Sequence, residues 1–295
     1  MRYTAFKLQL SSEIPLPLPS GSIDDLVDIR INKAVLPQLP RNQTLYGTWF
    51  EHGTREILIG WENYCYLRIH RGIAIDVQAE RDGNADFIKD PILGLAMAMA
   101  LQQRHHYVLH GSAVAIGDQA ALFIGDKGQG KSTVAAGFRS HGYSIMADDV
   151  SAVDFSGGIP RVRPGFPKMK LWPETLEQMG EDPSQYPAIM PGYDKKVCCL
   201  ASCFHNQLAP LAAIFVLATG PRLSITKIGF TESILALNSN RMGSSFTKGM
   251  PRQLFSRIFD QCAIIAKTVP IYQLTRPRDF RLLSETVKKI AAILT

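Results

Sequence analysis

The chain has 295 residues, a formal net charge of +6 and a hydrophobic content of 46%. This length suits one large domain or two of ordinary size, each with its own buried core. The basic residues are dispersed without a Lys/Arg block, which disfavours nucleic acid as a partner, and the most apolar stretch is too short to cross a membrane.

Residues 1-88 are expected to form a small antiparallel β-rich domain. Short strand-like segments follow one another here, with glycine or asparagine at or near several breaks between them. The segments are 3-10, 26-31, 44-50, 56-61, 64-70 and 72-77. Substrate binding is one role for this domain, although none of its residues requires it. The N-terminus lacks the apolar core of a secretory signal, so a cytoplasmic location is expected.

A change of composition over 86-91 marks the start of a second domain, residues 89-295, of α/β character. Residues 92-101 are apolar around most of a helix and predict a buried one. The runs 107-116 and 120-124 read as two strands, and Gly117-Asp118 between them predicts a tight hairpin. Further strands are expected at 143-147, 152-155, 211-218, 222-228 and 271-274, and helices at 231-237, 251-268 and 279-294.

Residues 160-205 are rich in proline, glycine and basic side chains, which predicts a long loop with a short helix starting near residue 171. Such a loop either closes over a phosphate or guides an acidic substrate, or it is simply solvated. Its basic residues are Arg161, Arg163, Lys168, Lys170, Lys195 and Lys196.

Five cysteines are present, and three of them lie near His205 in a pattern that invites a zinc interpretation. The paired spacing of structural zinc sites is missing, so reduced thiols are the favoured interpretation. These cysteines are Cys198, Cys199 and Cys203, with Cys65 and Cys262 elsewhere.

The most informative stretch comes after the apolar strand 120-124 and fits the pattern G-x-x-x-x-G-K-[ST]. Its glycines let the backbone wrap a phosphate, its lysine neutralises the charge, and its hydroxyl reaches a Mg²⁺ ion. A helix that begins directly after the loop would point its N-terminus at the anion. The predicted phosphate-binding residues are Gly125, Asp126, Lys127, Gly128, Gln129, Gly130, Lys131, Ser132 and Thr133.

Phosphate transfer additionally needs a carboxylate near the terminal phosphate. Asp148 and Asp149 end the predicted strand 143-147, and a turn there would let both side chains reach the loop. One of them would bind Mg²⁺ and the other would take a proton from an attacking hydroxyl. The alternative interpretation is a solvated turn.

His110 is the third candidate. Pairing through the Gly117-Asp118 hairpin would bring it level with the end of the strand that leads into the loop, and Gly111 beside it permits close approach of another backbone. An isolated histidine has a structural role more often than a catalytic one, and only this register argues for the site.

These segments resemble the catalytic core of the HPr kinase/phosphorylase family. The resemblance rests on the runs 109-114, 122-133 and 142-150, in the order histidine-glycine, phosphate loop and paired aspartates. It implies a phosphoenolpyruvate carboxykinase-like P-loop fold and transfer of phosphate from ATP to a serine hydroxyl. It further implies that Asp148 is the general base, that His110 positions it, and that Ser132 and Asp149 lie near Mg²⁺.

Two departures separate the chain from the sugar-regulating enzymes of that family. Thr133 replaces the glutamate that comes after the loop serine, and the later signature of the dephosphorylating reaction is missing. The segments 162-167 and 171-173 are similar in style to lasso-peptide tailoring kinases, which phosphorylate a precursor peptide.

The sequence therefore predicts an ATP- and Mg²⁺-dependent kinase acting on a serine of a peptide or small protein, with Asp148, His110 and Lys131 as catalytic residues. A small-molecule kinase, an HPr-type regulatory kinase and a non-catalytic nucleotide-binding module are the alternatives. Oligomeric state and the identity of the acceptor stay open, as do roles in the site for Glu174, Arg276 and Arg278.

Overall fold

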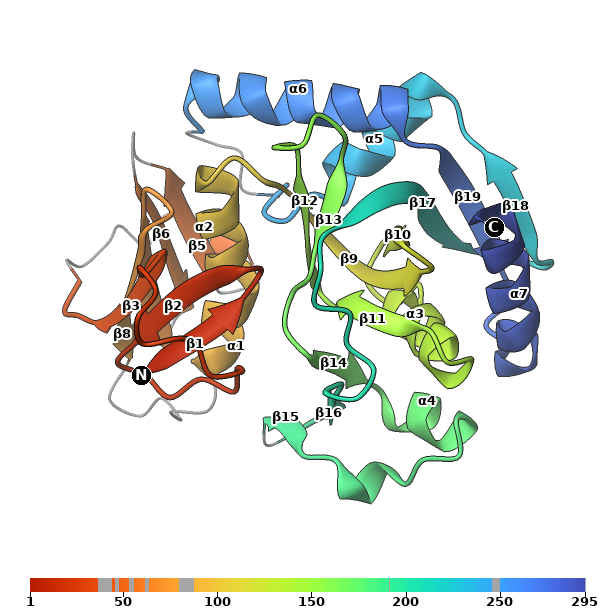
Figure 1. Cartoon of the computed structure of the whole chain (residues 1–295), viewed down its shortest axis with the longest axis horizontal. Helices are drawn as coiled ribbons and strands as arrows, with labels where there is room; N and C mark the ends of the chain where they lie inside the picture. The colour runs from red at the N-terminus through yellow and green to blue at the C-terminus, as the bar shows by residue number, and fades with distance from the viewer. Residues whose placement is uncertain are drawn as a thin grey trace. The chain divides into compact units, whose positions relative to one another are not determined.

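The computed structural model describes residues 1-36, 44-45, 48-52, 56-61, 64-79, 88-190, 192-245 and 250-294 (Figure 1). It is a mixed α/β structure with several sheets. The contacts group the chain into two compact units, Met1–Tyr107 with Met242–Phe259, and Val108–Arg241 with Asp260–Thr295. These units describe contacts and not independent folding, so the division into domains 1-88 and 89-295 stays a prediction.

The first unit is built on an eight-stranded sheet in the order β1-β2-β3-β8-β7-β6-β5-β4. β2 pairs with β3 and β3 with β8 in parallel, whereas the other neighbours are antiparallel, so the expectation of an antiparallel sheet was right for most pairs but not for these two. The strands are β1 (Arg2–Ala5), β2 (Leu8–Ser12), β3 (Ile29–Lys33), β4 (Thr44–Leu45), β5 (Thr48–His52), β6 (Glu56–Trp61), β7 (Cys65–His70) and β8 (Ala74–Ala79).

The first predicted strand, 3-10, is in fact the hairpin β1-β2. Phe6 and Lys7 both have left-handed backbones, with φ of 54° and 57°, which is the geometry of a two-residue turn between twisted strands. Neither residue is a glycine or asparagine, so the sequence carried no turn signal at this point.

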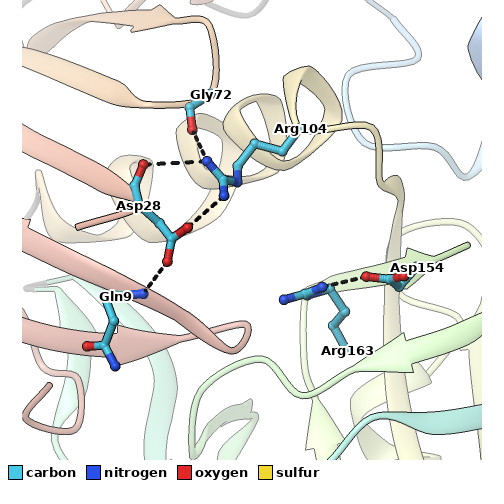
Figure 2. A network of polar contacts seen from close by, with 6 residues as sticks. All are labelled: Gln9, Asp28, Gly72, Arg104, Asp154 and Arg163. Atoms are coloured by element: carbon cyan, nitrogen blue, oxygen red, sulfur yellow. Dashed lines mark hydrogen bonds and ion pairs between the residues drawn. The ribbon is translucent and has the colours of Figure 1, made fainter. Parts of the chain in front are cut away.

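A helical segment covers part of this unit and is held by an arginine at its end. It comprises α1 (Lys89–Pro91), a π-helical turn (Ile92–Ala96) and α2 (Met97–Gln103), and its apolar residues are mostly buried, as predicted. After α2, Arg104 donates to a carboxylate oxygen of Asp28 at 2.7 Å and to the carbonyl of Gly72 at 3.3 Å (Figure 2). The other carboxylate oxygen of Asp28 accepts from the backbone N–H of Gln9 at 2.9 Å, so one aspartate links the helix end to the sheet.

The second unit is organised by strands that end near one another. β17 pairs in parallel with both β10 and β19, so all three carboxyl ends lie at the same edge. The full order is β10-β9-β12-β13-β17-β19-β18, with β11 paired to β9. The strands are β9 (Tyr107–Ile116), β10 (Gln119–Ile124), β11 (Ser144–Ala147), β12 (Val150–Asp154), β13 (Arg161–Arg163), β17 (Ala209–Thr219), β18 (Ser224–Lys227) and β19 (Ile271–Arg276).

The predicted hairpin is confirmed, because β9 and β10 pair with Ile116 opposite Gln119 and with Gly111 opposite Ile124. Across β12 and β13, Arg163 forms an ion pair with the buried Asp154 (Figure 2). The helices are α3 (Lys131–Ser140), α4 (Pro173–Gln178), α5 (Phe230–Ser239), α6 (Arg252–Thr268) and α7 (Leu283–Leu294), with 3₁₀ turns at Pro183–Gln185 and Phe280–Leu282. α6 begins in the first unit and ends in the second.

The segment 160-205 is not a long loop. It contains β13, α4 and a three-stranded antiparallel sheet, β14 (Lys168–Leu171), β16 (Tyr193–Cys199) and β15 (Ala188–Met190) in the order β14-β16-β15. In β14 buried Met169 and Leu171 alternate with partly exposed Lys168 and Lys170, which is the two-residue period of a half-buried strand. The high proline and glycine content around it concealed this short alternation.

Buried aromatic rings fill the core of the second unit. The ring of Phe123, on β10, lies 5.5 Å from that of Phe138 on α3 and 5.7 Å from that of Phe215 on β17. Phe215 in turn stacks on Tyr272 of β19 at 5.4 Å. These contacts fix α3, and with it the loop before α3, against the parallel strands. Within the described ranges, no helix is both long and apolar enough to span a membrane.

Phe123→Ala is therefore expected to lower the free energy of unfolding by about 3 to 5 kcal/mol, because it removes a fully buried ring and leaves a cavity among its neighbours. Urea denaturation followed by circular dichroism measures this. Phe230→Ala is the matched control, since Phe230 is 49% exposed at the start of α5, and its cost is expected to be about 1 kcal/mol or less. Equal costs for the two variants would contradict the described packing.

Candidate active site

The loop between β10 and α3 has a backbone that requires glycine at several positions. Gly125, Gly128 and Gly130 have φ of 143°, 87° and 87°, which side-chain-bearing residues rarely adopt. At Gly125 a Cβ atom would also lie only 2.9 Å from the carbonyl oxygen of Leu217 on β17. The chain thus turns sharply out of the sheet, and α3 starts directly behind the turn.

Lys131, the first residue of α3, is folded back over the loop and buried. Its Nζ donates to the carbonyl oxygens of Gly125 at 2.7 Å and Asp126 at 3.1 Å. Burial lowers the pKa of Lys131 below its usual value, although the carboxylates of Asp149 and Asp148 act in the opposite direction. An ammonium group has three donors and the two carbonyls use two of them, so one donor is left for a phosphate oxygen in the loop.

Asp148 lies at the end of β11 and is 6% exposed. Its Oδ1 accepts from the hydroxyls of Ser112 on β9 at 2.7 Å and Ser132 on α3 at 2.9 Å, and its Oδ2 accepts from the backbone N–H of Lys170 at 2.9 Å. Burial, and then the neighbouring Asp149, raise the pKa of this carboxyl, against the effect of the three hydrogen bonds. One carboxylate therefore connects β9, the loop helix and β14.

Asp149 turns the chain with a left-handed backbone, φ 65°, an arrangement that aspartate tolerates better than most residues. This turn lets the carboxylates of two consecutive aspartates both act on Lys131 of the loop. The Oδ2 of Asp149 lies 3.0 Å from Nζ of Lys170. Burial alone would raise the pKa of Asp149, but Lys170, His110 and Lys195 together hold it below its usual value. The two aspartates are thus shifted in opposite directions.

His110 lies on β9, and its Nδ1 is 3.1 Å from the main-chain carbonyl oxygen of Asp149. Since a carbonyl only accepts, this contact requires the proton on Nδ1 and leaves Nε2 as the acceptor of a neutral ring. Burial, and then the positive charge of Lys131, lower the pKa of His110. The ring consequently stays neutral to a lower pH than a free histidine.

Stability should depend on pH through this histidine. The unfolded chain takes up a proton as the pH falls through the ordinary histidine pKa, about 6.5, whereas buried His110 resists it. Lowering the pH from about 7.5 to about 5.5 should therefore destabilise the wild type more than a His110→Gln variant. Urea denaturation of both proteins at both pH values measures the difference, and an identical pH dependence would contradict the burial of this ring.

Asn240, directly after α5, joins the loop to β9. Its Oδ1 accepts from the backbone N–H of Gly125 at 2.8 Å, and its carbonyl oxygen accepts from the N–H of His110 at 2.8 Å. No sequence signal pointed to this residue, because it is over a hundred positions from its partners along the chain and belongs to no motif.

A basic face of the three-stranded sheet borders the aspartates. Lys170 of β14 contacts both of them, one through its N–H and the other through its Nζ. On the adjacent β16, Lys195 lies over the ring of Trp172, 5.6 Å from its centroid, and Trp172 also packs on Tyr193. Of the lysines that sequence reasoning placed in a loop, Lys170 and Lys195 therefore project from a defined sheet and act on the carboxylate of Asp149.

The structure brings together the candidates His110, Lys131, Ser132, Asp148 and Asp149, which come from three separate segments. Sequence reasoning missed Ser112, although it lies in the quoted run 109-114, and it gave Lys170 only a general role. Glu174 is exposed on α4. Thr133 has its Oγ1 3.4 Å from Oγ1 of the buried Thr175.

The remaining loop residues differ in exposure. Gln129 accepts from the hydroxyl of Thr219 at 2.8 Å, while Asp126, Lys127 and Gly128 are exposed at the tip. The cysteines are free, with Cys198 buried and Cys199 exposed. In the part of the chain that the structure describes, no three His, Cys, Asp or Glu side chains are grouped to hold a metal, so the zinc interpretation gains no support there.

Comparison with known proteins adds little to this geometry. No protein-family model matches the sequence, and no curated protein matches it. Among solved structures, the chain is similar to the Hpr(Ser) kinase/phosphatase from Coxiella burnetii, with a TM-score of 0.31 and 11% sequence identity over 63% of this chain and 96% of that one.

Proposed function

We propose that the protein is an ATP- and Mg²⁺-dependent kinase that transfers the γ-phosphate to a serine hydroxyl of a peptide or small protein. The observation that carries this proposal is the hydrogen bond from the loop hydroxyl of Ser132 to Asp148. Asp149, the next residue, forms an ion pair with Lys170. A loop that only held a nucleotide would not need two carboxylates with oppositely shifted pKa values at its metal-binding hydroxyl.

The residues fit Mg²⁺-ATP. Glycine-dependent backbone turns and the buried Lys131 suit the phosphates, while the Ser132 hydroxyl and carboxylate oxygens are ligands of the kind Mg²⁺ prefers. Bound Mg²⁺-ATP would supply an electrophilic phosphoryl group with its charge partly neutralised. We assign Lys131 and the backbone of residues 125-133 to the phosphates, and Ser132 and Asp149 to the metal.

Asp148 is proposed as the general base that takes the proton of the acceptor hydroxyl. Its raised pKa supports this role, because a base works best when its pKa approaches the working pH. A metal-binding role for Asp148 is the alternative, because its Oδ1 accepts from the Ser132 hydroxyl that is assigned to the metal. His110 would hold the main chain of Asp149 and so fix the direction of both carboxylates.

The class of acceptor is proposed from charge and from the sequence resemblance. By register, Lys168 and Lys170 on β14 and Lys195 on β16 share one face of the three-stranded sheet, whereas Lys196 lies on the other, and Lys170 contacts both aspartates. Such a surface attracts an acidic segment and stabilises charge on the transferred phosphoryl group. A precursor peptide of the lasso class, encountered in the cytoplasm, fits this chemistry, and neither nucleic acid nor a membrane is part of the proposal.

Incubation with Mg²⁺-ATP and serine-containing peptides, among them acidic and precursor-type sequences, tests the proposal by mass spectrometry. The expected result is a mass gain of one phosphate that disappears when the acceptor serine is replaced by alanine. Release of ADP without any modified peptide would contradict a peptide kinase. Phosphate appearing on small hydroxylated metabolites in a parallel screen would identify a small-molecule kinase.

A further inference from the structure

Arg276, the last residue of β19, lies against the phosphate loop. A Cβ atom on Gly130, the last residue before α3, would be only 2.3 Å from Nη2 of Arg276, so the guanidinium occupies the space that a side chain there would take. β19 reaches this position because it runs parallel to β17, which runs parallel to the loop strand β10. The carboxyl end of a parallel sheet is where ligands bind in open α/β folds.

The guanidinium is buried and poorly paired. Arg276 is 8% exposed, and its Nε has no hydrogen-bond partner among the described residues. Its Nη1 is 3.4 Å from the carbonyl oxygen of Pro277, which is a long contact, and no carboxylate in the described ranges forms an ion pair with it. Burial, and then the charge of Arg278, lower the pKa of Arg276, so its charged form lacks compensation.

A buried cation without a counter-charge is costly, and such groups are normally paired in the functional state. Here Nη2 of Arg276 lies against the last glycine of the loop, next to the first turn of α3, whose N–H groups favour an anion. Arginine presents its donors in a planar fork that matches two phosphate oxygens. The same position would be closed to any residue at 130 larger than glycine.

We propose that Arg276 binds phosphate oxygens of the nucleotide at Gly130, as a second cationic ligand in addition to Lys131. This inference rests on the proposed function only in requiring that the loop hold a nucleoside polyphosphate. It gives the loop two cations from opposite ends of the unit's sequence, Lys131 on α3 and Arg276 on β19. The base of the nucleotide is not its target.

Isothermal titration of Mg²⁺-ATP and of inorganic tripolyphosphate tests this with the full chain. Arg276→Gln is expected to weaken both ligands by about ten- to a hundredfold, the usual effect of losing a charged hydrogen bond. Arg276→Lys should recover part of the affinity, because the charge returns without the fork. Arg278→Gln is the control, because it removes the same charge from an exposed side chain two residues further along the chain. It should change both affinities by about twofold or less.

Three results would overturn the inference. The first is an unchanged affinity for both ligands in Arg276→Gln, and the second is a loss of affinity for ATP but not for tripolyphosphate, which would indicate a contact with the base. The third is an equal loss of affinity in Arg278→Gln, which would indicate only a long-range effect of the positive charge. Thermal melting without ligand identifies a variant that is misfolded, and Arg276→Lys then decides the question. A peptide phosphorylation assay run in parallel distinguishes failure of this inference from failure of the proposed kinase function. Weakened ATP binding by Arg276→Gln in a protein that modifies no peptide would support Arg276 and refute the kinase.

Discussion

Asp148→Asn is expected to reduce phosphate transfer to a peptide by about 10²- to 10⁴-fold, the usual contribution of a general base. Asparagine keeps the size of the side chain and can still accept from Ser112 and Ser132 through its amide oxygen, so the loop should hold its shape, although its amide nitrogen cannot accept from the backbone N–H of Lys170. The affinity for ATP should change by less than about threefold if the carboxylate acts on the acceptor and not on the nucleotide. Rapid-quench measurement of single turnovers, together with titration of ATP, separates the two effects.

Asp149→Asn is the matched variant, because it removes the neighbouring charge and asparagine tolerates the same left-handed backbone. If Asp149 binds the metal, this variant should need a higher Mg²⁺ concentration to reach half of its maximal rate, whereas Asp148→Asn should need the same concentration as the wild type. The reverse pattern would exchange the roles of the two aspartates. Full activity in Asp148→Asn would refute the base role.

Lys131→Ala is expected to lower transfer by about 10²- to 10³-fold, because it removes a buried charge that stabilises the transferring phosphoryl group. ATP affinity should also fall, since Lys131 is one of the two cations proposed to lie at the phosphates. Titration with Mg²⁺-ATP and the same single-turnover assay measure both quantities.

Lys288→Ala serves as the control for charge, because Lys288 is exposed on α7 and its removal changes the net charge equally. It should leave affinity and rate within about twofold of the wild type. A Lys131→Ala protein that melts like the wild type and still binds ATP normally would refute the phosphate-loop interpretation itself.

Local signals in the sequence were sufficient for much of the fold. The hairpin of β9 and β10 was predictable because Gly117-Asp118 separates two apolar runs, and its register placed His110 next to the loop. β6 and α6 were also close to their predicted limits, because Gly53 and Asn63 come near the two ends of the strand and Pro251 directly precedes the helix. In contrast, the turn at Phe6 and Lys7 and the short sheet of β14 to β16 lack such signals.

The candidate site was predictable only where its residues belong to a short motif. The loop and the paired aspartates come directly after predicted strands, so their meeting could be inferred. Lys170 and Arg276 reach the site through pairings formed between distant segments, which one sequence cannot reveal. Their roles depend on tertiary structure, and only the geometry distinguishes them from other basic residues.

Asn240 makes the length of a helix part of the site's geometry. It lies directly after α5 and bonds through its side chain to Gly125 and through its carbonyl to His110. Each residue added to or removed from a helix rotates the next segment of the chain by about 100° and shifts it by about 1.5 Å. A single-residue insertion in α5 would therefore break the link that Asn240 makes between Gly125 and His110 without changing any residue near the aspartates, so the length of this helix sets the spacing of the candidate site.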